Sequence, residues 1–192
     1  MNTTDGPALS TAIRNGVMIG MIAGAAMATY AMLASATYQH HGFFTPLFHI
    51  SAVFGSPKSM MQSMTAAMRG DTFWFESGAA LVGLLVHMVT GAMYGVGFAV
   101  FARRLRGSGT LVAVGMGYGL VALVLSGLVG LPVASAITGA GKTISDMADM
   151  VGWGTIAVEH LIFGLTLGVG VAASRGLVRP IRAEGQRSVI AA

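Results

Sequence analysis

The sequence contains no cysteine and few charged residues. Cysteine is absent from all 192 residues, which excludes disulfide bonds, thiolate metal sites and a cysteine nucleophile. Charged residues make up 9% and hydrophobic residues 54% of the chain, whereas soluble domains usually carry about 25% charged residues. This shortage of charge excludes an ordinary soluble domain and indicates a lipid environment.

Four apolar segments are each long enough to cross a membrane as a helix, which needs about 20 residues. They cover residues 16–38, 79–102, 111–131 and 151–174, and Glu159 is the one charged residue within them. The pattern predicts an all-α, polytopic membrane protein whose residues 1–192 form a single four-helix domain. A signal-peptidase site at 34–36, "ASA", is the alternative, but the apolar run before it exceeds the about 7 to 15 residues of the apolar h-region of a signal peptide.

The connections between these segments are uneven in length. Residues 39–78 form a long connection in which "TPLFHISAVFG" and "SPKSMMQSMTAAMRG" each have proline as the second residue and glycine as the last. Proline favours the first turn of a helix and glycine the position after its end. We therefore expect two short helices in the membrane interface. Residues 132–152 form a second connection on the same side, and residues 175–192 form a basic tail.

Basic residues are unequally divided between the two sides of the predicted bundle. Eight lie on the side of the termini: Arg14, Arg103, Arg104, Arg106, Arg175, Arg179, Arg182 and Arg187. Three lie on the other side: Lys58, Arg69 and Lys142. Because cytoplasmic loops carry the excess of Lys and Arg, both termini are predicted to be cytoplasmic. The same flanking arginines explain the net charge of +4, so it does not indicate nucleic-acid binding.

The second and fourth apolar segments resemble each other. "HMVTGAMYGVGFA" at 87–99 and "HLIFGLTLGVGVA" at 160–172 share six of thirteen residues, including the histidine and three glycines. Both segments run from the outer to the inner side. The chain therefore reads as two helical hairpins in parallel orientation, an arrangement found in membrane proteins built from internal repeats.

Glycines recur at four-residue intervals in these segments. Residues four apart share one face of a helix, and small residues there allow two membrane helices to approach closely. The predicted contact glycines are Gly16, Gly20, Gly24, Gly83, Gly91, Gly95, Gly164 and Gly168. The two histidines of the repeated motif, His87 and His160, lie on the same faces.

His87 and His160 are predicted at matching depth. Each lies about 23 Å from the inner boundary at about 1.5 Å per residue, and ionisable groups inside a membrane are costly and usually functional. Glu159 is adjacent, and His40, His41 and His49 lie on the same outer side. Three roles remain open for His87, His160 and Glu159: hydrogen bonds between helices, a metal or haem site, and a path for protons or a small substrate.

The ligand alternatives need different surroundings. A haem held by His87 and His160 requires a porphyrin lying against the glycine faces. A copper or zinc site requires Glu159 or the outer histidines His40, His41 and His49 to reach three or four donors. The outer methionines Met60, Met64 and Met68 share a helix face, and their thioethers suit Cu(I).

One nucleotide-like motif is discounted. "AITGAGKT" at 136–143 fits a relaxed phosphate-loop pattern, but such a loop needs a buried strand before it and a soluble helix after it. Here it follows a membrane span, so neither a nucleotide nor a nucleic acid is an expected partner. The expected partners are the lipid bilayer and a second copy of the chain or a larger membrane complex.

With "GFFTPLFHIS" and the two histidine motifs, the chain resembles the small four-span bacterial inner-membrane proteins of the YagU type. The resemblance implies a multi-pass protein of the bacterial inner membrane. The leading functional hypothesis is a non-enzymatic accessory or assembly protein that packs through its glycine faces. The alternatives are a haem or metal protein for electron transfer or metal handling at His87 and His160, and a small channel or transporter.

Overall fold

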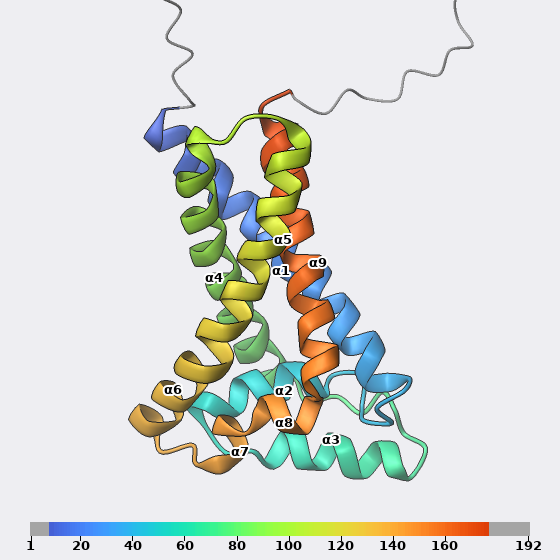
Figure 1. Cartoon of the computed structure of the whole chain (residues 1–192). Coiled ribbons are helices and arrows are strands. Elements are labelled where there is room, and N and C mark those ends of the chain that lie inside the picture. Colours follow the sequence, from blue (N-terminus) through green and yellow to red (C-terminus); the bar gives the residue numbers. More distant parts are fainter. Residues whose placement is uncertain (1–7, 177–192) are drawn as a thin grey trace, which may run out of the picture.

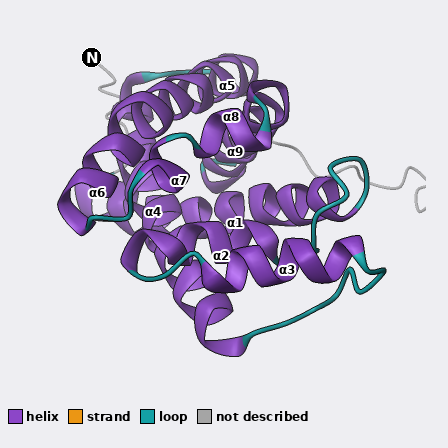
Figure 2. Cartoon of the chain, turned by 90° about the horizontal axis from the view of Figure 1, so that it is seen from below, coloured by secondary structure: helices purple, strands orange, loops and turns teal. Residues whose placement is uncertain are grey.

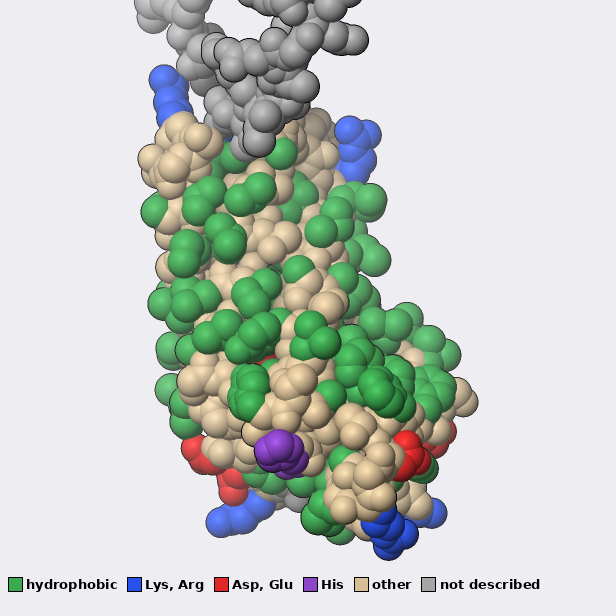
Figure 3. Space-filling model, turned by 90° about the vertical axis from the view of Figure 1, so that its right-hand side faces the viewer, with side chains coloured by type: hydrophobic (Ala, Val, Ile, Leu, Met, Phe, Trp, Pro, Cys, Tyr) green, Lys and Arg blue, Asp and Glu red, His purple; other side chains and the backbone are tan. Residues whose placement is uncertain are grey.

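The computed structural model describes residues 8–176, and within them the regular structure is entirely helical. Four of the helices there are long and apolar enough to cross a membrane, as predicted. They are α1 (Leu9–Ala36), α4 (Ser77–Phe101), α5 (Ser108–Leu125) and α9 (Trp153–Ser174). Hydrophobic side chains cover the length of the bundle, and Lys and Arg side chains lie at its two ends (Figure 3). The predicted basic tail from residue 177 onward lies outside the described residues.

Two boundaries differ from the sequence prediction. The first span begins at Leu9 and not at residue 16. The third continues beyond residue 131, because α5 passes through the π-helical turn η3 (Ser126–Gly130) into α6 (Leu131–Thr138). Pro132 lacks a backbone N–H and usually interrupts a helix. Here a π-helical turn, which closes wider hydrogen-bonded loops, ends at Gly130, two residues before Pro132, and the helix continues where a connection was predicted.

The four long helices form two pairs that pack through glycine. In the first pair, α1 lies against α4, and a Cβ atom on Gly20 or Gly95 would collide with backbone of the facing helix. In the second pair, α5 lies against α9, where a Cβ on Gly115 would be 2.5 Å from the Gly164 carbonyl oxygen. These glycines therefore allow the backbones of both helix pairs to approach closely.

Two of the predicted contact glycines behave differently from the rest. Gly24 is looser, because a Cβ there would be 3.5 Å from Met88 Cε and 3.7 Å from His87 Nε2, which are ordinary contacts. A Cβ on Gly83 would collide with the Leu47 carbonyl of the short helix α2 (Thr45–Ser51). Gly83 therefore admits the short helix α2 against α4.

The two pairs are joined mainly by α1 and α9, which cross near the centre of the bundle (Figure 1). Ile19, Phe98, Leu167 and Val171 belong to the buried cluster at this junction. A Cβ on Gly170 of α9 would lie 2.5 Å from the Ile19 side chain, so the crossing is also a close one. The short turn η2 (Ala102–Arg104) ends α4.

The remaining elements cover one end of the bundle, which we call the cap end (Figures 1 and 2). They are α2, η1 (Ala52–Phe54), α3 (Lys58–Met68), α7 (Lys142–Ser145) and α8 (Met147–Val151). The two predicted short helices thus exist, as α2 with η1 and as α3. Helix α2 lies between the spanning helices and α3, and its Phe48 is fully buried against Trp74 at a ring-centroid distance of 5.6 Å. The opposite end, where α1 begins and α9 ends, is called the terminal end.

Candidate functional site

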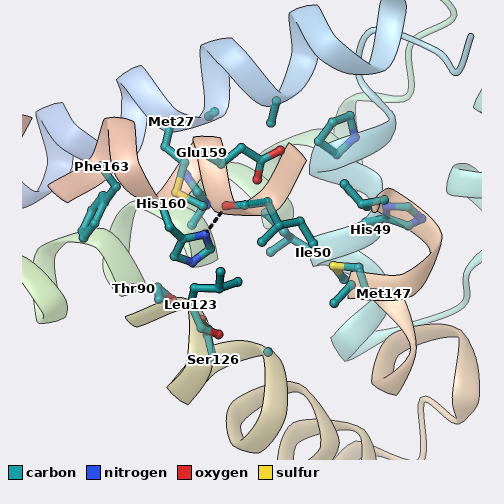
Figure 4. Close-up of a pocket in the computed structure, with 18 of the residues that line it drawn as sticks. Met27, His49, Ile50, Thr90, Leu123, Ser126, Met147, Glu159, His160 and Phe163 are labelled. Atoms are coloured by element: carbon teal, nitrogen blue, oxygen red, sulfur yellow. Dashed lines mark hydrogen bonds between the residues drawn. The ribbon is translucent and has the colours of Figure 1, made fainter. Parts of the chain in front are cut away.

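A cavity of about 220 Å³ lies between the two helix pairs, beneath the cap end. Its walls come from α1, α2, α4, α8 and α9 and from the α5–η3–α6 segment. Most of the lining is apolar, with Met27, Leu123, Ile156 and Phe163 among its residues (Figure 4). A small, largely apolar compartment therefore lies within the membrane-spanning part of the protein.

The structure brings five of the predicted site residues to this cavity: His41, His49, His87, Glu159 and His160. They come from four places in the chain: the α1–α2 connection, α2, α4 and α9. The sixth, His40, is exposed and does not line the cavity. Its backbone has a positive φ of 56°, a conformation that residues other than glycine rarely adopt.

Both spanning histidines direct one ring N–H to a backbone carbonyl. His87 Nε2 lies 2.9 Å from the Gly24 oxygen of α1, and His160 Nδ1 lies 2.9 Å from the Ile156 oxygen of its own helix. A carbonyl oxygen only accepts, so each of these nitrogens donates. In the neutral ring the other nitrogen, Nδ1 of His87 and Nε2 of His160, then carries a lone pair. The site therefore contains hydrogen-bond acceptors from both helix pairs.

Glu159 is the acidic residue of the cavity. Its side chain projects from α9 into the cavity (Figure 4) and is 8% exposed. No hydrogen bond or ion pair joins its carboxylate to another of the described residues. A buried carboxylate without a partner is costly, so a bound donor or cation would stabilise it.

His49 is a second buried polar residue without a partner. It is 4% exposed, and its Nε2 atom forms no hydrogen bond with the described residues. Burial, with a smaller effect of the neighbouring His41, lowers the pKa of His49 to about 4. Burial and the neighbouring His40 also lower the pKa of His41. Both rings are therefore neutral at pH 7, which adds further imidazole nitrogens to the cavity without adding positive charge.

Several lining residues were missed in the sequence because their types carry no chemical signal. Gln39 closes the cavity at the cap end, where its Nε2 donates to the Val151 oxygen at 2.7 Å. Thr90 and Ser126 line the opposite side from Glu159 (Figure 4). Ser126 opens the π-helical turn, and Pro132 downstream was the sequence feature that could have drawn attention to this segment.

The geometry of the site gives little support to the metal and haem hypotheses. Among residues 8–176 no three or more His, Asp or Glu side chains are grouped closely enough to hold a metal ion. The glycine faces assigned to a porphyrin are filled by neighbouring helices, and the cavity is smaller than the about 300–1,000 Å³ typical of ligand pockets. Met60 and Met64, considered for copper, pack against the α2 cluster of Leu47 and Phe48.

No protein-family model, curated protein or solved structure matches the chain. The resemblance to YagU-type proteins stays a prediction.

Proposed function

We propose that the protein is a membrane-embedded binding protein for a small organic cation, an amine with a short apolar body. The observation that carries this proposal is the unpaired Glu159 carboxyl group, buried in a cavity that His87 and His160 also line. His87 and His160 use their ring N–H groups on backbone carbonyls. A protonated amine donates up to three hydrogen bonds and accepts none, so it complements this set.

The cavity also limits the size of the ligand and favours an apolar body. A volume of about 220 Å³ admits a short chain or a small ring but not a macrocycle. Met27, Leu123 and Phe163 offer apolar contacts to that body, which are worth about 25 cal/mol per Å² of apolar surface removed from water. The ammonium group of the ligand therefore provides selectivity for amines, and its apolar body provides much of the binding affinity.

Three ligands of equal length test the proposal: hexylamine, hexanol and hexanoate. Binding to the full-length protein in lipid nanodiscs is measured by fluorine NMR with ω-fluorinated analogues. Hexylamine should bind most tightly and hexanoate least, because a hydrogen bond to a charged group contributes about 1.5–3 kcal/mol, or about tenfold or more in affinity. Equal affinities for all three would refute a cation site.

The variant Glu159→Gln should remove the preference for hexylamine over hexanol and leave hexanol binding nearly unchanged. Asp71→Asn is the matched control, since Asp71 is exposed and does not line the cavity. It should keep the preference. A preference that survives in Glu159→Gln would contradict the role given to this carboxylate.

The accessory hypothesis has less support than a binding function. It required glycine faces free to contact another protein, whereas Gly20, Gly95, Gly115 and Gly164 contact helices of the same chain. Self-association or a larger complex stays a prediction. A small transporter also needs a binding site of this kind, and uptake into proteoliposomes that is lost in Glu159→Gln would extend the function to transport.

The proposal includes an orientation, with the terminal end in the cytoplasm of a bacterial inner membrane. Five arginines lie at the terminal end: Arg14, in the first turns of α1, and Arg103, Arg104, Arg106 and Arg175. Three basic residues lie at the cap end: Lys58, Arg69 and Lys142. Because the chain has no cysteine, single cysteines at Ser108 and Ser56 can be labelled in intact cells with an impermeant maleimide. Labelling at Ser56 alone is expected, and labelling at Ser108 alone would reverse the orientation.

A further inference from the structure

The cavity is closed toward the cap end by several layers. The Gln39 amide donates to the Val151 oxygen at 2.7 Å and so connects the α1–α2 connection to α8. Behind it, Ser35 Oγ donates to the Gly42 oxygen at 2.8 Å. His49 of α2, 4% exposed, also belongs to this wall. A ligand arriving from water at this end would have to break buried polar contacts.

One wall of the same cavity reaches the outside of the bundle. Thr90 of α4 lines the cavity and is itself exposed. Two neighbouring residues of α4, His87 and Gly91, line the cavity. Two others, Val89 and Met93, lie on the outer surface and are 59% and 69% exposed. Thr90 therefore lies at the boundary between the cavity and the surface that faces lipid.

The depth of Thr90 places this boundary in the hydrocarbon layer. Helix α4 runs from Ser77 to Phe101, so at about 1.5 Å per residue Thr90 lies about 20 Å from its start and about 17 Å from its end. The hydrocarbon core of a bilayer is about 30 Å thick. Thr90 is therefore near the middle of the membrane and not in the polar interface.

The segment beside Thr90 at this wall of the cavity is suited to opening. Thr90, Leu123 and Ser126 gather on one side of the cavity (Figure 4). Tyr118 Oη donates to the Tyr94 oxygen at 2.9 Å and holds α5 to α4 on the terminal side of this point. Beyond it, α5 becomes the π-helical η3, which begins at Ser126 and includes two glycines. π-helical turns occur frequently at functional sites, and glycine adds backbone freedom.

We propose that the ligand enters and leaves sideways, from the lipid, between Thr90 of α4 and the η3 turn. This inference rests on the proposed function and narrows its ligand to a lipid-soluble weak base, since a permanent cation does not partition into hydrocarbon. The free amine enters uncharged and takes the proton of the Glu159 carboxyl group. An ammonium and a carboxylate result, so the net charge of the cavity does not change.

The exchange rate of ω-fluorohexylamine, measured by fluorine exchange NMR in nanodiscs, tests the route separately from the affinity. The protein has no native cysteine, so Thr90→Cys can be measured before and after reaction with a lipid-soluble maleimide on the same folded sample. Reaction should slow exchange by about tenfold or more, which is about 1.4 kcal/mol in the barrier. Val89→Cys is the matched control, and its labelling should not alter exchange.

The outcomes separate the route from the function. Unchanged exchange in labelled Thr90→Cys, in a protein that still binds hexylamine through Glu159, would refute the lateral route alone. Faster exchange in Gln39→Ala with no effect at Thr90 would establish entry from water at the cap end. An absence of saturable binding in the wild-type protein would instead refute the proposed function. Thr90→Ser, which keeps the hydroxyl and removes a methyl group, should exchange at least as fast as the wild type.

Discussion

The close packing of α5 against α9 makes a quantitative prediction for two glycines on one helix. Gly115 faces α9, and a Cβ atom there would lie 2.5 Å from the Gly164 oxygen, about 0.5 Å inside the 3.0 Å that Cβ contacts keep, and 3.0 Å from Gly168 Cα. Gly117, two residues later on α5, has no atom within 4 Å of its Cβ position. The substitutions Gly115→Ala and Gly117→Ala thus add the same methyl group to opposite environments.

The size of the effect follows from two opposing terms. Alanine favours a helix interior over glycine by about 0.5–1 kcal/mol, and this gain applies to both variants. Overpacking costs about 1–3 kcal/mol and applies to Gly115→Ala alone, because the colliding atoms belong to backbone that cannot rotate away. We expect a net loss of up to about 2.5 kcal/mol for Gly115→Ala and a gain of about 0.5–1 kcal/mol for Gly117→Ala.

Reversible unfolding in mixed micelles of dodecyl maltoside and SDS, followed by circular dichroism, measures both changes in the free energy of unfolding. Each variant is the control for the other, because both replace glycine with alanine in the same helix. If Gly115→Ala is as stable as Gly117→Ala, the glycine contacts do not hold α5 against α9, and the packing described for both helix pairs is wrong.

Three further predictions concern the cap end and the junction of the helix pairs. Folding lowers the pKa of His49 from its ordinary value of 6.5 to about 4. Between these two pH values the unfolded chain therefore binds a proton at His49 that the folded protein does not bind. The free energy of unfolding should therefore fall by about 1.4 kcal/mol per pH unit from about pH 6.5 to pH 4, and His49→Gln should lack this slope in parallel titrations. Phe48→Ala should cost about 3–5 kcal/mol in the same SDS assay, because the fully buried ring leaves a cavity; a loss below 1 kcal/mol would show that α2 is not packed there. Tyr118→Phe should cost about 1 kcal/mol and speed ligand exchange, since it removes the hydrogen bond to the Tyr94 oxygen; unchanged exchange would separate this bond from the proposed route.

The candidate site was predictable in its location more than in its contacts. Similar spacing from flanking arginines predicted His87 and His160 at matching depth, and the structure brings both to one cavity with Glu159. The hydrogen bond from His87 to the Gly24 oxygen joins residues 63 positions apart in sequence. No local pattern indicates it. His40 was expected beside His41 in the site, but a positive φ of 56° at His40 accompanies its exposed position.

The sequence by itself determined that this chain is a bundle of four spanning helices with glycine contact faces. Hydropathy and small-residue spacing are local properties, and a bilayer leaves a continuous apolar segment little choice but a helix, because every backbone group must be bonded within it. Only the tertiary structure decided which glycine meets which helix, that Gly83 receives α2, and that η3 carries the third span past Pro132. The cavity is likewise a property of the tertiary structure alone, because its volume depends on how helices from distant parts of the sequence pack around it.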